Sequence, residues 1–516
     1  MGNGPAFDTG AWRIEGHETA PDADLVRSVW AKDDSAWPQG EDAPSDRLGW
    51  LELPESMTSE VEGLEQFARE VAEEGTEAVV LLGMGGSSLA PEVFAATLGS
   101  AESYPALFVL DSTHPVEVQG LKESIDPEST LFVVSSKSGG TVETMSLYRY
   151  FHSLIPDGRR FVAITDPGTS LAALAERDGL RALFANPPDI GGRYSALSLF
   201  GLVPAALIGA GIDSLLEGGR RGALACRSED PNVNPGLAIG AAMGELAKAG
   251  RDKLTFMLSP ELTALGDWLE QLIAESTGKH GTGIVPVVRE PLVEPEAYGA
   301  DRVFAIVRVP GDRSHEGLIS SLRGEGHPVI VGECAPPEGL GEQMFVWEFA
   351  IAVAGAVLGV NPFDQPNVES AKKISRSLFE SGDDLELEDT APEDLFADVR
   401  PGEVAAILAF APRTPGAEEL LQAARRKLIG RGVATMQGFG PRYLHSTGQL
   451  HKGGPQGIRA LVVVDSPDID VPIPGEEAGF ARLVTAQALG DAGALADGGK
   501  RVAMTSWRRL QEWVHS

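Results

Sequence analysis

Hydroxyl side chains are concentrated between Ser135 and Thr144, directly after the apolar run Leu131–Val134. Such a run is typical of a buried strand. A hydroxyl-rich glycine turn followed by a helix N-terminus presents O–H and N–H donors to an anion such as a phosphate group. Thr141 could cap that helix. The stretch therefore predicts a site for a phosphorylated small molecule, and an ordinary polar loop is the alternative.

A glutamate and an arginine elsewhere in the chain could move a proton and stabilise an anion. Gln271 and Glu275 are four residues apart, so they share one face of a helix. Glu275 falls at the C-terminal end of that helix, where the dipole should raise the carboxyl pKa and make it a better general base. Arg193 follows two glycines, and its guanidinium could reach a developing oxyanion. A solvated glutamate and a surface arginine are the alternatives.

Two histidines lie in the polar segment from Arg442 to Gly454. His445 and His451 are six residues apart, which is not the spacing of a metal pair on a helix. Proton transfer is the better use for one of them, although both could be solvated loop residues. Asn361–Pro366, which precedes Lys372, is rich in turn-forming residues and taken alone is typical of a surface turn.

The glycine-rich stretch Gly83–Ser88 also suggests a dinucleotide site, with Asp111 as the acid that binds a ribose. Ser88 occupies the third glycine position of that fingerprint. A nicotinamide site does not need the second hydroxyl-rich loop, which counts against a dehydrogenase. Ser87 could instead add a hydroxyl to the phosphate site.

Apolar runs alternate with helical patterns of ten or more residues, which is typical of a doubly wound parallel sheet in an α/β protein. The runs of the first block end in small or polar residues, at the strand ends where such sheets bind ligands. A second block of similar type follows. Predicted strands are Ala78–Leu82, Leu107–Leu110, Leu131–Val134, Phe161–Ile164, Lys253–Leu258, Ile284–Val288, Arg302–Val309, Pro328–Val331, Val404–Phe410 and Ile458–Val464.

We expect five regions along the 516 residues. An arm at 1–58 wraps the body, α/β domains occupy 59–220 and 221–380, a solvated acidic linker spans 381–401, and a further α/β region spans 402–516. The apolar stretch Met344–Val360 contains Glu348 and is short for a membrane span, so it predicts a buried core helix.

The net charge of −33 argues against nucleic acid as a partner, because phosphate neutralisation needs a basic surface. Cys226 and Cys334 are the two cysteines, which favours a reducing cytoplasm over a disulfide framework or structural zinc. Met1–Gly10 has no basic or apolar segment typical of a signal peptide. We therefore expect a cytoplasmic protein without a membrane anchor.

Taken together, five sequence elements resemble the glucose-6-phosphate isomerase family, in particular the bacterial branch also found fused to transaldolase. Each element is weak alone, but the combination is specific and covers roughly residues 75–375. In the second element Ser138 and Gly140 replace family threonines. The elements are G-x-G-G-S at Gly83–Ser87, S-K-T-x-T-T-x-E-T at Ser136–Thr144, G-G-R-[FY]-S at Gly191–Ser195, E-S-x-G-K at Glu275–Lys279 and N-[PA]-F-D-Q-x-x-V-E at Asn361–Glu369.

The resemblance implies two sugar-isomerase (SIS, flavodoxin-like) domains, a homodimer and reversible conversion of glucose 6-phosphate to fructose 6-phosphate through a cis-enediol. It implies no cofactor and no metal, and it raises a functional link to transaldolase. Glu275 would move the proton, Arg193 would stabilise the enediolate, and Lys372 would assist ring opening. The residues implied to bind the substrate are Ser87, Ser136, Lys137, Ser138, Thr141, Gln271 and Gln365.

The ring-opening histidine departs from the family pattern, in which it lies between the glutamate and lysine motifs and often reaches in from the neighbouring subunit. The best match to its surroundings is His445–His451, after Lys372. We favour His445 over His280. Two alternatives remain open: an isomerase that also accepts mannose 6-phosphate, and a non-catalytic sugar-phosphate sensor.

Overall fold

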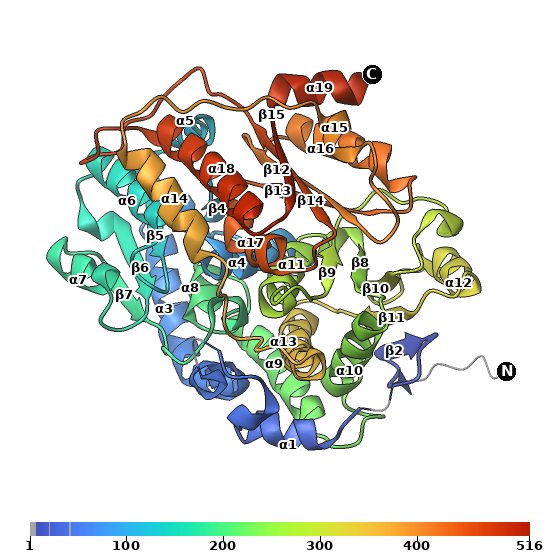
Figure 1. Cartoon of the computed structure of the whole chain (residues 1–516). Coiled ribbons are helices and arrows are strands. Elements are labelled where there is room, and N and C mark those ends of the chain that lie inside the picture. The colour runs from blue at the N-terminus through green and yellow to red at the C-terminus, as the bar shows by residue number, and fades with distance from the viewer. Residues whose placement is uncertain (1–6, 20, 41–42) are drawn as a thin grey trace.

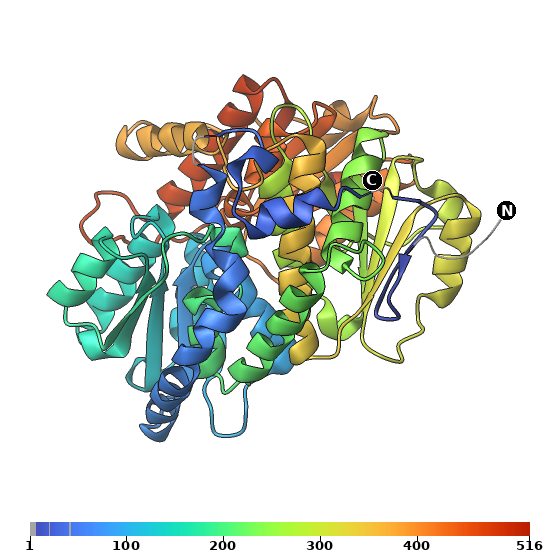
Figure 2. The ribbon, with the colours of Figure 1, turned by 90° about the horizontal axis from the view of Figure 1, so that it is seen from below.

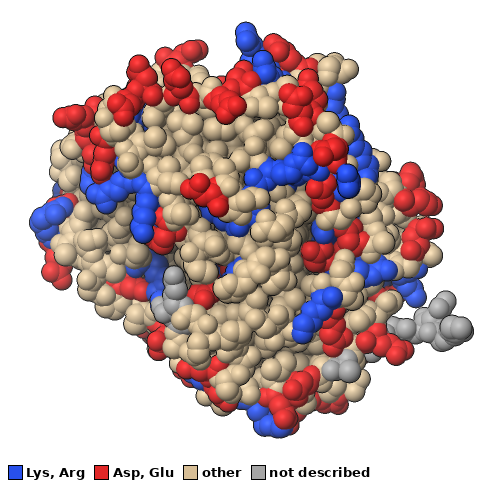
Figure 3. Space-filling model, in the orientation of Figure 1, with Lys and Arg blue, Asp and Glu red and all other residues tan. Residues whose placement is uncertain are grey.

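The computed structural model describes residues 7–19, 21–40 and 43–516. It contains three sheets, and the mixed α/β class with parallel sheets expected from the sequence is confirmed. In Figure 1 the first sheet lies on the left, the second on the right and the third, with its red and orange helices, at the top. Acidic side chains are spread over the face in Figure 3, with basic ones interspersed among them.

The first sheet has five parallel strands in the order β4-β3-β5-β6-β7. The order reverses direction beside β3, so this is a doubly wound sheet of the flavodoxin type. Its strands are β3 (Ala78–Gly83), β4 (Ala106–Leu110), β5 (Thr130–Ser135), β6 (Phe161–Thr165) and β7 (Ala182–Ala185), and its helices are α3 (Val61–Glu73), α4 (Leu89–Leu98), α5 (Pro115–Ser124), α6 (Val142–Leu154), α7 (Ser170–Arg177) and α8 (Leu199–Leu207).

The second sheet combines four parallel strands with two antiparallel ones from the arm, in the order β1-β2-β11-β10-β8-β9. Figure 2 shows the blue N-terminal segment crossing the molecule towards this sheet. The strands are β1 (Phe7–Asp8), β2 (Trp12–Glu15), β8 (Lys253–Leu258), β9 (Val285–Val287), β10 (Arg302–Arg308) and β11 (Val329–Glu333), and the helices are α1 (Asp24–Trp30), α2 (Leu53–Ser56), α9 (Ile212–Cys226), α10 (Pro235–Lys248), α11 (Leu265–Thr277), α12 (Glu316–Gly324) and α13 (Glu338–Leu358).

The third sheet is parallel, in the order β13-β12-β14-β15. Figure 1 shows α14 and α18 side by side between this sheet and the first, and the two helices pack together. The strands are β12 (Val404–Phe410), β13 (Ala434–Phe439), β14 (Ile458–Val464) and β15 (Arg501–Ser506), and the helices are α14 (Glu369–Glu380), α15 (Pro392–Phe396), α16 (Pro415–Ile429), α17 (Gly448–Gly453), α18 (Phe480–Asp497) and α19 (Trp507–His515).

Helix α13 is the apolar helix expected from the sequence. It is long and apolar enough to cross a membrane by length and composition, but 83% of the relevant window is buried inside the protein. Burial raises the pKa of its Glu348 carboxyl well above the ordinary range, because a charged carboxylate is costly in the core. The prediction of a buried core helix is confirmed.

The ten predicted strands all occur, but β1, β2, β7, β13 and β15 were not predicted. β7 lies at a sheet edge and its residues are exposed or half-buried, so it lacks the continuous apolar run of a central strand. The expectation of a solvated linker at 381–401 is wrong in part, because Leu395 and Phe396 of α15 are buried against the third sheet. The division into five domains stays a prediction.

Candidate active site

Helix α11 carries the candidate base. Glu275 lies in its last turn, is 6% exposed, and accepts a hydrogen bond from Gln271 Nε2 at 3.3 Å. Burial raises the pKa of the Glu275 carboxyl above its ordinary value, although Arg193 and His445 act in the opposite direction. The expected direction is correct, but the largest cause is desolvation rather than the helix dipole.

The guanidinium of Arg193 is held rigidly next to this carboxyl. Arg193 lies in the short 3-10 helix Gly192–Tyr194, and its Nη1 is 3.4 Å from Glu275 Oε2. Its Nε donates to Ser276 Oγ at 2.8 Å, and its Nη2 donates to the carbonyl oxygens of Pro362 and Asp364 at 2.6 and 2.9 Å. These hydrogen bonds fix the orientation of the guanidinium, so its positive charge is held in one position beside Glu275.

Lys279 anchors the loop 361–365. The sequence analysis did not assign this lysine to the site. Lys279 Nζ donates to Asn361 O at 2.5 Å and to Asp364 O at 2.7 Å. Burial, reinforced by the charge of Arg193, lowers the pKa of Lys279 to about 7. Gln365 is exposed, with its Oε1 3.4 Å from Arg193 Nη1, so it lies at the edge of the cluster.

His445 joins this cluster from the third region of the chain, in the 3-10 helix Arg442–His445. Its Nε2 is 2.9 Å from Glu143 Oε1, and its carbonyl oxygen accepts from Gln271 Nε2 at 2.8 Å. Burial would raise the pKa of Glu143, but the charge of His445 and its hydrogen bond outweigh burial and lower it. The structure therefore forms a histidine–carboxylate pair beside α11.

The other two histidines considered are placed differently. His280 is exposed and has a positive φ of 56°. His451 is 1% exposed, and burial lowers its pKa to about 3, so it remains neutral at physiological pH. Of the three candidates, His445 is the one that pairs with Glu143 and contacts Gln271.

The hydroxyl-rich loop follows β5 and leads into α6, as the sequence predicts. Ser87 and Ser136 are buried, Thr141 is half-buried and Ser138 is exposed. Thr141 occupies the N-cap position, but its hydroxyl does not cap the helix, because it pairs with Ser136 Oγ at 2.9 Å. Of these hydroxyls, those of Ser136 and Thr141 are in contact at the N-terminus of α6.

Two of the predicted lysines have carboxylate partners. Lys137 Nζ forms an ion pair with Asp166 and donates to Pro188 O at 3.1 Å. Lys372 on α14 is exposed and pairs with Glu369 at 2.7 Å. The structure does not draw Lys372 into the cluster, although its charge contributes to the lowered pKa of Glu143.

The glycine-rich stretch after β3 is a junction between loops. Gly85 has a positive φ of 55°, and a Cβ there would collide with the His445 carbonyl oxygen. A Cβ at Gly86 would collide with the carbonyl of Gly192. Because protein backbone fills the space beside these glycines, the stretch lacks the open approach that a pyrophosphate needs. This disfavours the dinucleotide interpretation.

Four residues of the site were missed by the sequence analysis. Glu143 and Lys279 lie inside quoted motifs and could have been assigned from them, and Ser276 directly follows Glu275. Gln487 on α18 donates to Glu143 Oε1 at 2.8 Å and lies in no motif. Within the described residues, no group of three or more His, Cys, Asp or Glu side chains is arranged to hold a metal ion.

Comparison with known proteins gives consistent matches. A family model described as phosphoglucose isomerase matches residues 65–284. The glucose-6-phosphate isomerase of Rubrobacter xylanophilus is 31% identical over 388 residues, covering 64% of this chain and 88% of the relative. A glucose-6-phosphate isomerase of Thermus thermophilus is 31% identical over 389 residues, covering 64% and 90%.

Two solved structures share the fold. A hypothetical protein of Thermus thermophilus superposes with a TM-score of 0.57 at 28% identity, covering 69% of this chain and 93% of that one. A glucose-6-phosphate isomerase of Chlamydia trachomatis gives 0.58 at 19% identity, covering 72% and 89%. The family-model match includes Arg193 and Glu275 but ends before Lys372 and His445.

Proposed function

Because this chain belongs to the phosphoglucose isomerase family, we propose that it interconverts glucose 6-phosphate and fructose 6-phosphate. The observation that carries the proposal is the buried pair of Glu275 and Arg193, 3.4 Å apart, with His445 held beside it through Gln271. A carboxylate base, a fixed cation and an imidazole are the groups that an aldose–ketose isomerisation requires.

The reaction begins with opening of the sugar ring. His445 supplies the proton-transfer group, since an imidazole can give and accept protons near neutral pH. Glu143 orients the ring of His445 through the 2.9 Å contact at Nε2. Lys372 is proposed as the second group of this step on the strength of its motif, and its present partner Glu369 would have to release it.

The isomerisation itself moves one proton between neighbouring carbons. Glu275 removes the proton from C2 of the open aldose and returns it to C1, while a hydroxyl proton shifts between O2 and O1. The intermediate enediolate carries negative charge, which Arg193 offsets from its fixed position. A raised pKa makes Glu275 a stronger base than an exposed glutamate.

The phosphate group of the substrate is proposed to bind at the N-terminus of α6. Ser87, Ser136, Ser138 and Thr141 would donate hydroxyl protons there, and the helix end adds backbone N–H groups. Lys137 would add a positive charge that Asp166 now balances. Gln271 and Gln365 would line the sugar-binding side.

Several properties of the protein are proposed on the family, and the first of them also on the cysteine content. These are a cytoplasmic location, a homodimer and a functional link to transaldolase. The pairing of His445 with Glu143 within one chain supports the proposal that this histidine comes from the same subunit as Glu275.

A coupled assay tests the proposed function. Purified protein is given fructose 6-phosphate, and glucose 6-phosphate is detected with its dehydrogenase and NADP, with EDTA present throughout. We expect turnover that EDTA leaves intact. No turnover, with fructose 6-phosphate still raising Tm, would favour the sensor, and mannose 6-phosphate in a parallel assay tests the broader isomerase.

A further inference from the structure

Arg442 links three parts of the molecule through a single buried side chain. Its Nη1 donates to Asp111 Oδ2 at 2.5 Å, just after β4 of the first sheet. Its Nη2 donates to Glu92 on α4 and to Asp267 Oδ2 on α11, the latter at 3.3 Å. Arg442 itself belongs to the third region and lies three residues before His445. The turn that carries His445 is therefore tied to both other sheets.

The turn that carries His445 contacts one face of helix α11. Asp267, Gln271 and Glu275 are spaced four apart, so their side chains lie one above the other. Asp267 binds the Arg442 guanidinium, Gln271 binds the His445 carbonyl at 2.8 Å, and Glu275 is the proposed base. The same face thus sets the position of His445 relative to the base.

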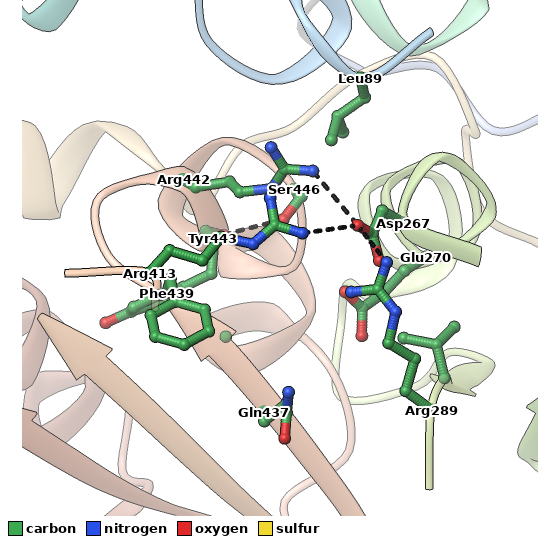
Figure 4. A pocket seen from close by; sticks show the side chains of 12 residues that line it. Leu89, Asp267, Glu270, Arg289, Arg413, Gln437, Phe439, Arg442, Tyr443 and Ser446 are labelled. Carbon is green, nitrogen blue, oxygen red and sulfur yellow. Dashed lines mark hydrogen bonds and ion pairs between the residues drawn. The ribbon is translucent and has the colours of Figure 1, made fainter. Parts of the chain in front are cut away.

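Figure 4 shows three arginines converging on Asp267. Arg289 lies 2.9 Å, Arg442 3.3 Å and Arg413 3.6 Å from its Oδ2. Arg413 also pairs with Glu92 at 2.9 Å, so it shares two carboxylates with Arg442. Arg413, however, lies far from the His445 turn in sequence, directly after β12. It is therefore a matched control for loss of one positive charge from this cluster.

We propose that Arg442 is a positioning residue for ring opening. By anchoring its turn to Asp111, Glu92 and Asp267, it holds His445 beside helix α11, in the position from which the imidazole reaches the substrate ring. The proposal rests on the proposed isomerase activity. Arg442 does not touch the substrate and acts through His445. Small displacements of an acid–base group can lower a rate about 100-fold, so an anchor of this kind has a measurable effect.

Two substrates separate ring opening from proton transfer. Glucose 6-phosphate is cyclic in solution and needs both steps. D-Erythrose 4-phosphate cannot close a ring, because its O4 is phosphorylated, so deuterium uptake at C2 in D2O reports proton transfer alone. The wild-type protein, R442K, R442Q, R413Q and H445Q are compared on both, by kcat/KM and by NMR exchange respectively.

We expect R442Q and H445Q to lose about 10- to 100-fold in kcat/KM on glucose 6-phosphate while retaining deuterium exchange on erythrose 4-phosphate. R442K should fall between them and the wild type, because an ammonium cannot bridge three carboxylates as the guanidinium fork does. R442K also keeps the buried positive charge, so it still tests the proposal if R442Q does not fold. R413Q should retain both activities.

Three results overturn the inference. Full activity of R442K and R442Q on glucose 6-phosphate would show that the anchor is dispensable. A parallel loss of both activities, or the same selective loss in R413Q, would show a general effect of disturbing the charge cluster rather than a positioning role of Arg442. A wild-type protein inactive on both sugars would overturn the proposed function and this inference with it, whereas the first two results leave the function intact.

Discussion

At the scale of single residues, burial decides which groups can do chemistry. Glu275 and Arg193 are 6% and 4% exposed, and each is surrounded by specific partners. Desolvation penalises the charged carboxyl, and the neighbouring cations partly restore it. Burial thus makes the Glu275 carboxylate a stronger base, while the neighbouring cations partly stabilise its charged form.

Replacing Glu275 with Gln keeps the side-chain shape but removes the base. We expect E275Q to lower kcat by about 100-fold or more, while fructose 6-phosphate still raises Tm because the hydroxyl-rich loop is intact. The coupled assay and a thermal shift measure the two effects. E261Q, at an exposed glutamate, is the control, and near-normal turnover by E275Q would contradict the mechanism.

The acidic limb of the pH profile should reflect the raised pKa of Glu275. The base works as a carboxylate, so activity is lost as pH falls through its pKa. Since burial raises that pKa above 4.5, kcat/KM should decline at a higher pH than an ordinary glutamate would produce. Initial rates across a pH series measure this, and a limb at or below pH 4.5 would refute the assignment.

At the scale of elements, the site forms where loops pack closely against one another at glycines, which have no side chain to keep the loops apart. Gly85 approaches the His445 carbonyl, and Gly86 approaches the Gly192 carbonyl next to Arg193. The two glycines therefore let the loop after β3 reach the proposed cation and the proposed ring-opening group together. Lys279 also helps to assemble the site, because it binds the loop 361–365, which accepts hydrogen bonds from Arg193.

A Cβ at Gly85 should separate this loop from its neighbours. We expect G85A to lower kcat/KM by about 10-fold or more and to destabilise the protein beyond the positive-φ penalty of about 1–2 kcal/mol. Gly179, in the left-handed turn that ends α7, has a similar φ of 64° but open space beside it, so G179A should cost only that penalty. Urea unfolding and the coupled assay compare them, and equal behaviour of the two variants would exclude a tight junction.

At the scale of the whole molecule, three sheets contribute to one cluster. Glu143 follows the first sheet's β5, Glu275 belongs to the second region, and His445 follows β13 of the third sheet. Two buried histidines lie in these regions, and their ring nitrogens have no hydrogen-bond partner among the described residues. His114, at the end of the first sheet, is 0% exposed, and His451 under the His445 turn is 1% exposed.

The two buried histidines should lower the stability of the protein as pH falls below about 6.5, whereas buried carboxyls with raised pKa values, such as Glu348, act in the opposite direction. Burial lowers the pKa of His114 to about 4 and that of His451 to about 3, so the unfolded chain binds protons that the folded protein excludes. The histidine contribution to the unfolding free energy then falls as pH falls from about 6.5 through these lowered pKa values, by at most about 3 kcal/mol for His114.

Urea unfolding at pH 7.5 and pH 5 measures this loss. H114Q and H451Q should each lose less stability, or gain more, than the wild type when pH falls from 7.5 to 5. H515Q, at an exposed histidine, should behave as the wild type. A wild-like pH dependence in both buried-site variants would assign the acid sensitivity to other groups.

The sequence by itself determined the class of fold and the local setting of several site residues. Strands such as β8, β12 and β14 could be predicted because buried parallel strands form continuous apolar runs. The hydroxyl-rich loop after β5 and the place of Glu275 at the end of α11 follow from spacing along the chain. These are local properties, in which the pattern and the structure share the same few residues.

Only the tertiary structure decided how distant segments meet. His445 lies 170 residues from Glu275 in the chain, and its turn reaches α11 through Arg442, Asp267 and Gln271. The pairing of Lys137 with Asp166 and the exposure of Lys372 likewise could not be deduced from spacing. Such contacts depend on how the three sheets pack, and the pKa values of the site depend on the burial that this packing creates.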